Sequence, residues 1–357
     1  MQRKVTVFDS RSNDLALAAE LAGAGCQVML YEHADSAMSL GTSPGEGTIA
    51  AVPESARAAA AAARAGSKGL AGLTNDMAEA ISFSEVLIFA LPLHAQEPIF
   101  RIALPHFRSG QTVVLVPGSF GSFVLRHLLA QAEPERDLRI VETAPRSLRN
   151  CPAAPDKVLS DRLPRALQIA ALPAWQSGDV LDVLNRVLPV ELSRVDNALE
   201  AAFSDPTAIL RTATAVIAQR QADGGPNPAG ATDEVISRVL RSMDSERRRI
   251  GRELGLRLEP FAALDHRIPR SAGTDPSVTA KDEGSCWLLP VLQFGELVGV
   301  EAPVMESVLT LLSIAGKTDC FQHGRTLQRM GLDGLTPEEI LACTLDDQYA
   351  GSAMYPR

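Results

Sequence analysis

The chain has 357 residues, of which 46% are hydrophobic and 22% charged, and its net charge is −9 at pH 7. This length and composition can bury a large core, predict two domains and exclude an intrinsically disordered chain. An acidic chain gives no electrostatic basis for binding nucleic acid or an anionic membrane surface. We therefore expect neither a nucleic-acid partner nor a membrane partner.

Two sequence features bear on cellular location. The longest apolar stretches, such as residues 86–92, are far shorter than the roughly 18 residues that a spanning helix needs. The N-terminal residues show no apolar core of a secretory signal, because polar residues follow at once at Asp9, Arg11 and Asn13. Five cysteines without CxxC or His-rich spacing fit a reduced chain without a zinc site. We expect a cytoplasmic protein with no metal site.

The first half of the chain alternates β-branched runs with Ala- and Leu-rich stretches. Buried strands are predicted at residues 5–8, 27–31, 86–91, 112–116, 138–141 and 166–172. Helices are predicted between or after them at residues 15–22, 53–65, 123–130 and 180–188. Continuous rather than alternating apolar runs favour a parallel sheet that is covered on both faces. This order predicts a doubly wound, Rossmann-like α/β domain over residues 1–196.

Helices dominate the remainder of the chain. They are predicted at residues 232–254, 304–315 and 337–343, the last opened by a capping box of Thr336 and Glu339. Arginines 247–249 predict a solvated helix face, and the polar stretch 272–284 predicts a loop of functional length. The predicted fold class is therefore α/β plus all-α: the Rossmann-like domain is followed by a helical domain over residues 197–357, with a cleft between them.

Several segments in both halves resemble the opine dehydrogenases of the octopine and nopaline type. In the first half these segments are VLIFALPLHAQ (86–96), GQTVVLVPGSFGS (110–122) and IVET (140–143). In the second half they are MDSERRRIGRELGL (243–256), ELVGVEAPVMESV (296–308) and, most specific, HGRTLQRMGLDGLTPEEIL (323–341). The resemblance covers nearly the whole chain. It implies reductive condensation of an amino acid with an α-keto acid by NADH or NADPH, with both small molecules bound in the cleft; a homodimer is compatible with it.

The Gly-x-Gly-x-x-Gly loop that follows the first strand in this family is altered here. Its three glycine positions fall on Asp9, Arg11 and Asp14. A carboxylate about 4 Å from a phosphate charge costs on the order of 4 kcal/mol at an effective dielectric constant of 20, which weakens ordinary dinucleotide binding. The cofactor-binding candidates are the groups of this loop that can still donate to a phosphate: Ser10, Arg11, Ser12 and Asn13.

Further cofactor candidates lie after three other predicted strands. Glu32 ends the second strand, where a Rossmann domain places the acid that binds ribose hydroxyls, although a solvated strand-end carboxylate is the alternative. Gly118 and Ser119 belong to a Pro-Gly turn whose backbone N–H groups can form an anion site, and a plain strand-to-helix turn is the alternative. Pro92, after strand 86–91, completes this set.

The resemblance also assigns candidate catalytic residues. Its proton donor and acceptor is the histidine of a His-Pro pair in the first helical segment of the second domain, oriented by the acid of a Glu-Asp pair. Arg211 and Thr212 stand at the His-Pro pair, and Asp282 and Glu283 stand at the Glu-Asp pair. Arginine does not exchange protons at neutral pH, but it binds carboxylates well. We therefore predict that Arg211 pairs with Glu283 or holds a substrate carboxylate.

Another group must then move protons if the cleft is catalytic. His266 and His323 are the histidines of the second half near the similar segments, and His266 is the third catalytic candidate beside Arg211 and Glu283. A structural or surface role is the alternative for both histidines. Arg149, near a Glu…Arg segment of the family, joins Arg211 and Thr212 as a candidate for substrate binding.

Two hypotheses remain open at this point. The first is an opine-type oxidoreductase with a remodelled phosphate loop and a different proton relay. The second is a diverged, non-redox homologue that keeps the cleft to bind or transform an amino-acid-derived ligand. Titration with NADH and NADPH distinguishes them, because only the first hypothesis requires a dinucleotide.

Overall fold

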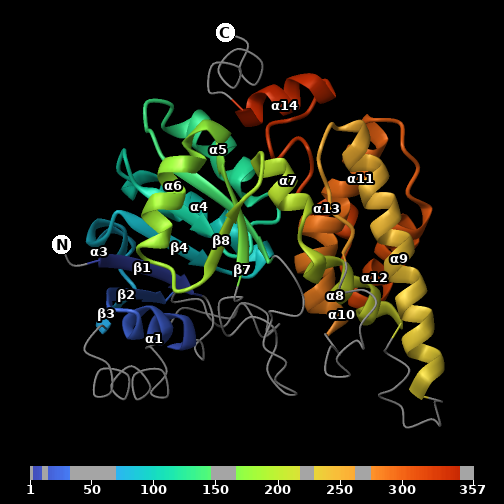
Figure 1. The fold of residues 1–357 in the computed structure, drawn as a ribbon, viewed down its shortest axis with the longest axis horizontal. Helices are drawn as coiled ribbons and strands as arrows, with labels where there is room; N and C mark the ends of the chain where they lie inside the picture. The colour runs from blue at the N-terminus through green and yellow to red at the C-terminus, as the bar shows by residue number, and fades with distance from the viewer. Residues whose placement is uncertain are drawn as a thin grey trace, which may run out of the picture.

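A computed structural model describes residues 3–9, 15–32, 70–145, 166–217, 229–261 and 275–345. Within these residues an eight-stranded sheet has the order β3-β2-β1-β4-β5-β6-β7-β8 (Figure 1). Its strands are β1 (Arg3–Asp9), β2 (Cys26–Glu32), β3 (Leu70–Thr74), β4 (Val86–Ala90), β5 (Thr112–Leu115), β6 (Arg139–Pro145), β7 (Ala166–Leu172) and β8 (Glu191–Arg194). Neighbouring strands are parallel except β6 and β7.

The six predicted strands are confirmed, and the two that were missed are the edges of the sheet. The central strand β5 is buried along its whole length, as a continuous apolar run predicts. The edge strand β8 has the sequence ELSR and is at least partly exposed at every position, so it carries no apolar signal. The other edge strand, β3, has only two buried residues in LAGLT.

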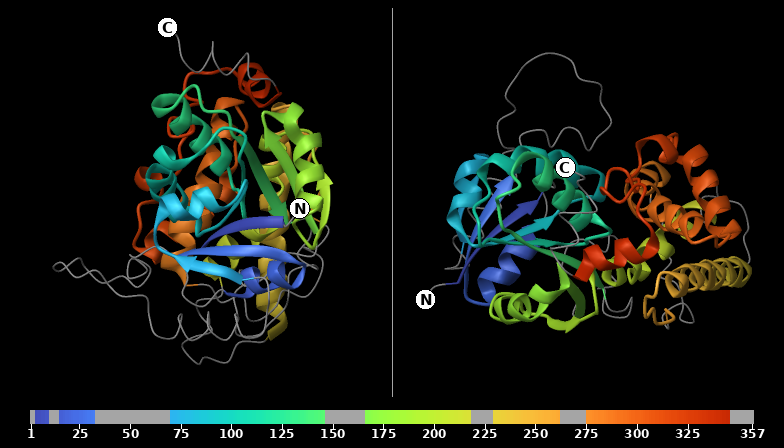
Figure 2. Two further views of the ribbon diagram at one scale, coloured as in Figure 1. Left: turned by 90° about the vertical axis from the view of Figure 1, so that its left-hand side faces the viewer. Right: turned by 90° about the horizontal axis from the view of Figure 1, so that it is seen from above.

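Helices cover both faces of this sheet, which confirms the doubly wound class. One face packs against α3 (Met77–Phe83), α4 (Leu93–Ala103) and α5 (Gly121–Ala132). The other face packs against α1 (Leu15–Gly23) and α6 (Ser177–Asn185). The view from above in Figure 2 shows the sheet between these two layers. The helix predicted at 180–188 begins three residues earlier in the structure, and the one predicted at 53–65 lies outside the described residues.

The second half of the described chain is helical. Its elements are α7 (Ala198–Phe203), α8 (Pro206–Ile217), α9 (Ala229–Glu253), α10 (Pro276–Thr279), the π-helix η7 (Ala280–Leu288), α11 (Leu289–Leu297), α12 (Pro303–Gly316), α13 (Cys320–His323) and α14 (Pro337–Leu345). Helices α8 to α13 stand beside the sheet, and α14 lies over it (Figure 1). The boundary predicted after residue 196 falls between β8 and α7 and stays a prediction, because α7 packs on β6 and β7.

The prediction of a loop over residues 272–284 is wrong for its described part. Asp275 caps α10 by accepting from the N–H of Ser277, and Pro276 occupies the first helical position. The chain then continues as η7, in which Ala280 and Trp287 are fully buried and Nε1 of Trp287 donates to the carbonyl of Ala202 at 2.8 Å. Tertiary packing therefore overrides the polar composition of this segment.

One packed core joins the sheet to the helices. The rings of Phe120, Phe203 and Phe294 lie within 5.7 Å of one another, centroid to centroid. These three residues come from the turn after β5, the end of α7 and α11. Aromatic contacts of this kind each stabilise by about 1 kcal/mol beyond the area that they bury. The helical part is thus anchored on the sheet by side chains as well as by the connecting chain.

The prediction of a solvated arginine face on α9 is wrong for Arg247, which is fully buried. Its Nε and Nη2 donate to the carboxylate of Asp244 at 3.0 and 2.7 Å, and its Nη1 donates to the carbonyl of Phe203 at 3.1 Å. The guanidinium also lies 3.8 Å from the ring centroid of Phe261. Arg247 therefore ties α9 to the end of α7 from inside the core.

Replacing this arginine tests that assignment. Arg247→Met should lower the free energy of unfolding by about 3 to 5 kcal/mol, because it leaves the buried Asp244 carboxylate without its partner. Arg238→Met, in an exposed ion pair with Glu234 on the same helix, should change it by less than about 1 kcal/mol. Urea unfolding followed by circular dichroism measures both. Equal effects for the two variants would contradict a structural role for Arg247.

Candidate active site at the carboxyl edge of the sheet

A buried arginine of the helical part, Arg325, contacts the segments that directly follow β4 and β5. Arg325 is 4% exposed. Its Nη2 donates to the carbonyl of Leu93 and to Oε1 of Gln96, both at 3.1 Å, and its Nη1 donates to the carbonyl of Ser119. The amide of Gln96 in turn donates to the carbonyl of Pro117 at 2.8 Å. Arg325 therefore connects the first turn of α4 with the turn after β5.

The glycine before this arginine brings it close to η7. A Cβ atom on Gly324 would lie 2.7 Å from the carbonyl oxygen of Ser285 and 2.5 Å from that of Cys320. Backbone oxygens cannot give way at such distances, so only glycine fits. The N–H of Arg325 donates to the same Ser285 carbonyl at 2.8 Å. The HGR segment is therefore held against the π-helix by its backbone and against the sheet edge by its guanidinium.

Asp282 and Glu283 are adjacent on η7, but they contact different side chains: Asp282 contacts His94, and Glu283 contacts Arg211. Oδ1 of Asp282 lies 2.6 Å from Nδ1 of His94 on α4 and accepts the backbone N–H of His94 at 3.1 Å. Oε1 of Glu283 lies 2.9 Å from Nη1 of Arg211 on α8. The predicted Arg211–Glu283 pair is present, while its role remains a prediction. Nε of Arg211 and Oε2 of Glu283 are buried without a hydrogen-bond partner among the described residues.

The environments of these two carboxyls separate their pKa values. Burial pushes the pKa of Asp282 up, but the hydrogen bonds and charge of His94 outweigh burial and hold it below its usual range. Burial raises the pKa of Glu283 to about 7, with the Asp282 and Asp205 charges adding to the rise and Arg211 opposing it. Asp282 is therefore ionised at neutral pH, whereas Glu283 is partly protonated there.

Asp205 is an acid of this cluster that sequence reasoning missed. It precedes Pro206, the first residue of α8, and accepts the N–H of Thr207 at 2.8 Å. Burial raises the pKa of its carboxyl. Since proline fits the first turn of a helix and not its interior, an Xaa-Pro pair belongs at this helix start, whereas Arg211 lies farther along α8. The Asp-Pro pair was the readable signal for this helix start.

Thr212 does not reach the cleft in the structure. It is fully buried, and its hydroxyl donates to the carbonyls of Ala208 and Ile209 in its own helix at 2.9 and 3.1 Å. Several other candidates lie outside the described residues and keep their roles as predictions: Ser10, Arg11, Ser12, Asn13, Arg149 and His266. Within the described ranges no group of three or more His, Cys, Asp or Glu residues could hold a metal ion.

Glu32 lies at the carboxyl end of β2, in register with Asp9 at the end of β1. Its side chain is buried, and neither carboxylate oxygen has a hydrogen-bond partner among the described residues. Burial raises the pKa of this carboxyl. The alternative of a solvated strand-end carboxylate is therefore not what the structure shows. Pro92, half-buried, caps α4 at the same edge of the sheet.

The Pro-Gly turn after β5 already holds an anion from within the protein. The fully buried carboxylate of Glu142 accepts the N–H groups of Phe120 at 2.8 Å and Ser122 at 3.0 Å. A Cβ atom on Gly118 would lie 2.1 Å from Oε1 of Glu142, so the glycine makes room for that carboxylate. These two N–H groups are not free for a cofactor phosphate. The buried hydroxyl of Ser119 has no partner among the described residues and stays a candidate.

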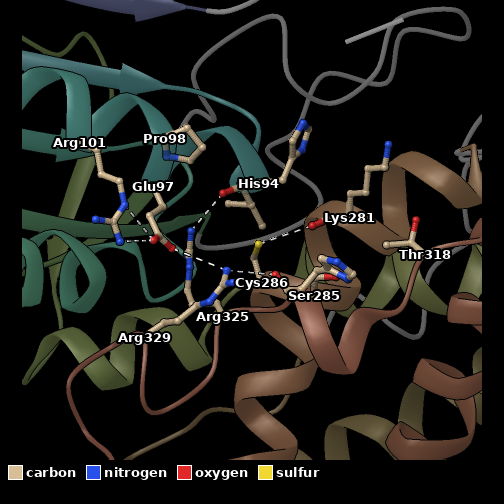
Figure 3. A pocket seen from close by; sticks show the side chains of 12 residues that line it. His94, Glu97, Pro98, Arg101, Lys281, Ser285, Cys286, Thr318, Arg325 and Arg329 are labelled. Atoms are coloured by element: carbon tan, nitrogen blue, oxygen red, sulfur yellow. Dashed lines mark hydrogen bonds and ion pairs between the residues drawn. The ribbon is translucent and has the colours of Figure 1, made fainter. Parts of the chain in front are cut away.

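A cavity of about 330 Å³ opens between α4 and η7 (Figure 3). Its described lining carries four fixed cations, Arg101, Lys281, Arg325 and Arg329, against the single carboxylate of Glu97. Other polar lining residues are His94, Ser285, Thr318 and His323. Burial raises the pKa of the lining thiol of Cys286 to about 12. The cavity is therefore suited to an anionic ligand, and His94 of the buried charge cluster reaches its wall.

Comparisons with known proteins agree with this arrangement. No protein-family model matches the chain. The opine dehydrogenase of Arthrobacter sp. (strain 1C) is 25% identical over 302 residues, which cover 76% of this chain and 84% of that protein. The vitopine synthase of Allorhizobium ampelinum is 23% identical over 295 residues, which cover 75% of this chain and 80% of that protein.

Among solved structures, octopine dehydrogenase with NADH and pyruvate matches with a TM-score of 0.61 at 15% identity, over 95% of this chain and 98% of that chain. The protein thus has two domains: a Rossmann-type domain, and a helical domain that lies beside the carboxyl edge of the Rossmann sheet. The chain is similar to opine dehydrogenases over about three quarters of its length and shares the fold of octopine dehydrogenase. None of the described helices is both long and apolar enough to cross a membrane.

The raised pKa of Glu283 predicts a pH-dependent loss of stability. Since the folded-state pKa lies near 7 and the ordinary value is 4.5, the stability linked to this group is complete below pH 4.5 and is lost as the pH rises to 7. At about 1.4 kcal/mol per pKa unit, the loss is about 3 kcal/mol. Glu283→Gln should remove this slope from the free energy of unfolding.

Urea unfolding at several pH values between 4.5 and 8 measures the effect. The difference in unfolding free energy between Glu283→Gln and the wild type should shift in favour of the variant as the pH rises. Glu338→Gln, an exposed substitution on α14, is the matched control and should show a constant difference. A constant difference for Glu283→Gln as well would show that this carboxyl titrates at its ordinary value.

Proposed function

We propose that the protein is an NAD(P)H-dependent oxidoreductase that reductively condenses an amino acid with an α-keto acid. The observation that carries this proposal is the cation-lined cavity between the carboxyl edge of a Rossmann sheet and the helical domain. Both substrates carry a carboxylate, which an excess of arginine and lysine attracts. The relatives that match about three quarters of this chain are named opine dehydrogenase and vitopine synthase, which supports this class of reaction. The non-redox alternative gains no support from these relatives.

Among the described residues, Glu32 is suited to bind the adenosine ribose of a dinucleotide. Glu32 offers two buried acceptor oxygens without donors at the end of β2, where a Rossmann domain binds the adenosine ribose. The hydroxyls of that ribose are the donors that such a carboxylate lacks. A 2′-phosphate would meet the carboxylate as a like charge, so Glu32 favours NADH over NADPH. Octopine dehydrogenase, a fold neighbour, binds NADH. When bound, the cofactor supplies the hydride for the reduction.

The residues of this chain would then hold the substrates and manage protons. Lys281 on η7 and Arg101 and Arg329 on the facing wall supply the charge for substrate carboxylates. Arg211, whose buried Nε has no acceptor among the described residues, is suited to fix a carboxylate and not to transfer a proton. Condensation also requires that the ammonium group of the amino acid lose a proton before its nitrogen attacks the keto carbon.

Two finer features belong to the same proposal. Cys26, Cys286, Cys320 and Cys343 carry free thiols, which supports a location in the reducing cytoplasm. Leu311 and Ile314, about one turn apart on α12, are exposed apolar side chains, which supports the homodimer that the sequence leaves possible. Light scattering on the purified protein measures its oligomeric state.

A direct assay tests the function. The purified protein is incubated with NADH or NADPH and pairs of α-keto acids and amino acids. Oxidation of the reduced nicotinamide is followed by absorbance, and the secondary amine product is identified by mass spectrometry. We expect oxidation that requires both substrates, with a product whose mass is the sum of the two substrates minus one oxygen atom. Reduced cofactor that neither binds in a fluorescence titration nor is consumed would overturn the oxidoreductase.

Glu32→Gln tests the cofactor assignment separately. Loss of the charged acceptor should raise the Kd of NADH about tenfold, which corresponds to roughly 1.4 kcal/mol, while the Kd of NADPH should change less or fall. Fluorescence titration of each cofactor measures this ratio. Glu85→Gln, exposed at the opposite end of the sheet before β4, is the control. An unchanged ratio of the two dissociation constants in Glu32→Gln would show that Glu32 does not contact the ribose.

A further inference from the structure

His94 and Asp282 form a contact that crosses from the Rossmann domain to the helical part. His94 lies in the first turn of α4, directly after β4, and Asp282 lies on η7. Nδ1 of the imidazole is 2.6 Å from Oδ1 of the carboxylate, which also accepts the backbone N–H of His94 at 3.1 Å. One carboxylate oxygen thus holds both the backbone and the ring of the histidine in place.

This geometry assigns the protons of the imidazole. Asp282 is 9% exposed in its side chain and remains a carboxylate at neutral pH, so it accepts a hydrogen bond from the N–H at Nδ1. The neutral ring then carries its hydrogen on Nδ1 and presents Nε2 as an acceptor. The described residues provide no hydrogen-bond partner for Nε2, and the side chain of His94 is 39% exposed. A histidine oriented by a buried acid with its other nitrogen open is the arrangement of a general base.

His94 is one of the residues that line the cation-lined cavity. Charged or titratable groups around His94 and Asp282 are Glu97 and Arg101 on α4, Lys281 and Glu283 on η7, Arg211 on α8, His323 at the end of α13, and Arg325 and Arg329 beyond it. Lys281 and the arginines are fixed cations, and Asp282 is the carboxylate in contact with the ring. These cations would attract carboxylate substrates into the cavity. The reacting groups of the substrates would then come close to His94, which Asp282 orients.

The other candidate groups in this region are less suited to exchange protons. Glu283 is 7% exposed in its side chain and is tied to Arg211. Cys286 remains a thiol because burial raises its pKa to about 12. His323 also lines the cavity, but Nδ1 of its ring contacts the backbone carbonyl of Asp319, at 3.2 Å, and no carboxylate of the described residues orients the ring.

We propose that His94, oriented by Asp282, is the group that exchanges protons with the substrates in this cavity. The inference rests on the proposed function. Nε2 takes one proton from the ammonium group of the amino acid, and the freed amine forms a C–N bond to the keto carbon as the C=O π bond breaks. A second proton passes from the nitrogen to the resulting alkoxide, and the proton held by Nε2 returns to that hydroxyl, which leaves as water and gives an iminium. When bound, the reduced nicotinamide would supply the hydride that converts this iminium into the neutral secondary amine.

His94→Gln is the decisive variant, with Asp282→Asn as a test of the positioning residue. With His94→Gln, kcat at pH 7 should fall about 100-fold or more, the typical contribution of a general base. KM and the Kd of NADH should stay within about threefold, and the acid limb of the wild-type pH profile should disappear. Asp282→Asn should lower kcat less, and the double variant should lose little more than His94→Gln, because the two residues act as a unit. His106→Gln, away from the cavity, is the matched control.

A second measurement does not depend on turnover. In protein labelled with ¹⁵N at histidine, the His94 signals, assigned by their absence in His94→Gln, should show a protonated Nδ1 and an unprotonated Nε2 at pH 8. Asp282→Asn should abolish this preference. A His94→Gln variant with wild-type kcat and pH profile would overturn the proton role alone and leave the oxidoreductase standing. Wild-type protein that consumes no reduced cofactor with any substrate pair would overturn both.

Discussion

The buried guanidinium of Arg325 is the interaction on which the site depends. Its donors reach carbonyl groups after β4 and after β5, while its backbone N–H binds η7, so one residue holds three segments together. The turn after β5 lies between this cation and the Glu142 carboxylate, which accepts two of the turn's N–H groups. Hydrogen bonds between buried charged groups and neutral ones are worth about twice an ordinary one, and leaving such a charge unpaired is costly. The two walls of the cavity are consequently fixed relative to each other.

The second constraint is electrostatic. Asp205, Asp282 and Glu283 are all nearly buried within one region, and their repulsion contributes to the raised pKa of Glu283. Arg211 is the fixed cation among them. A neutral imidazole in its place would leave these carboxyls without that counter-charge, so one or more would have to take up a proton. The arginine is therefore explained by the acids that surround it, and the proposal assigns proton exchange to His94 instead.

Much of the fold was readable from the sequence, because a fully buried parallel strand such as β5 is a continuous apolar run. The edge strand β8 was not, since its residues are exposed and follow no pattern. The helix from Asp275 onward had a readable cap, but its burial depends on close contacts such as Gly284 with Leu312, which no local pattern records. In the site, Arg211 and Glu283 were found through the family resemblance. His94 was missed because its partner lies 188 residues away in sequence.

The π-helix explains how adjacent acids serve different purposes. Such wider turns concentrate at functional sites, and here Asp282 faces α4 while Glu283 faces α8. In the opine dehydrogenases that this chain resembles, the second acid of the pair orients a histidine of the helical domain. Here that acid neutralises an arginine, and the acid before it orients a histidine of the Rossmann domain. In the proposed arrangement, proton exchange requires contact between the two domains, because His94 belongs to the Rossmann domain and Asp282 to the helical domain. On the proposed mechanism, catalysis therefore depends on the contact between the two parts that Arg325 maintains.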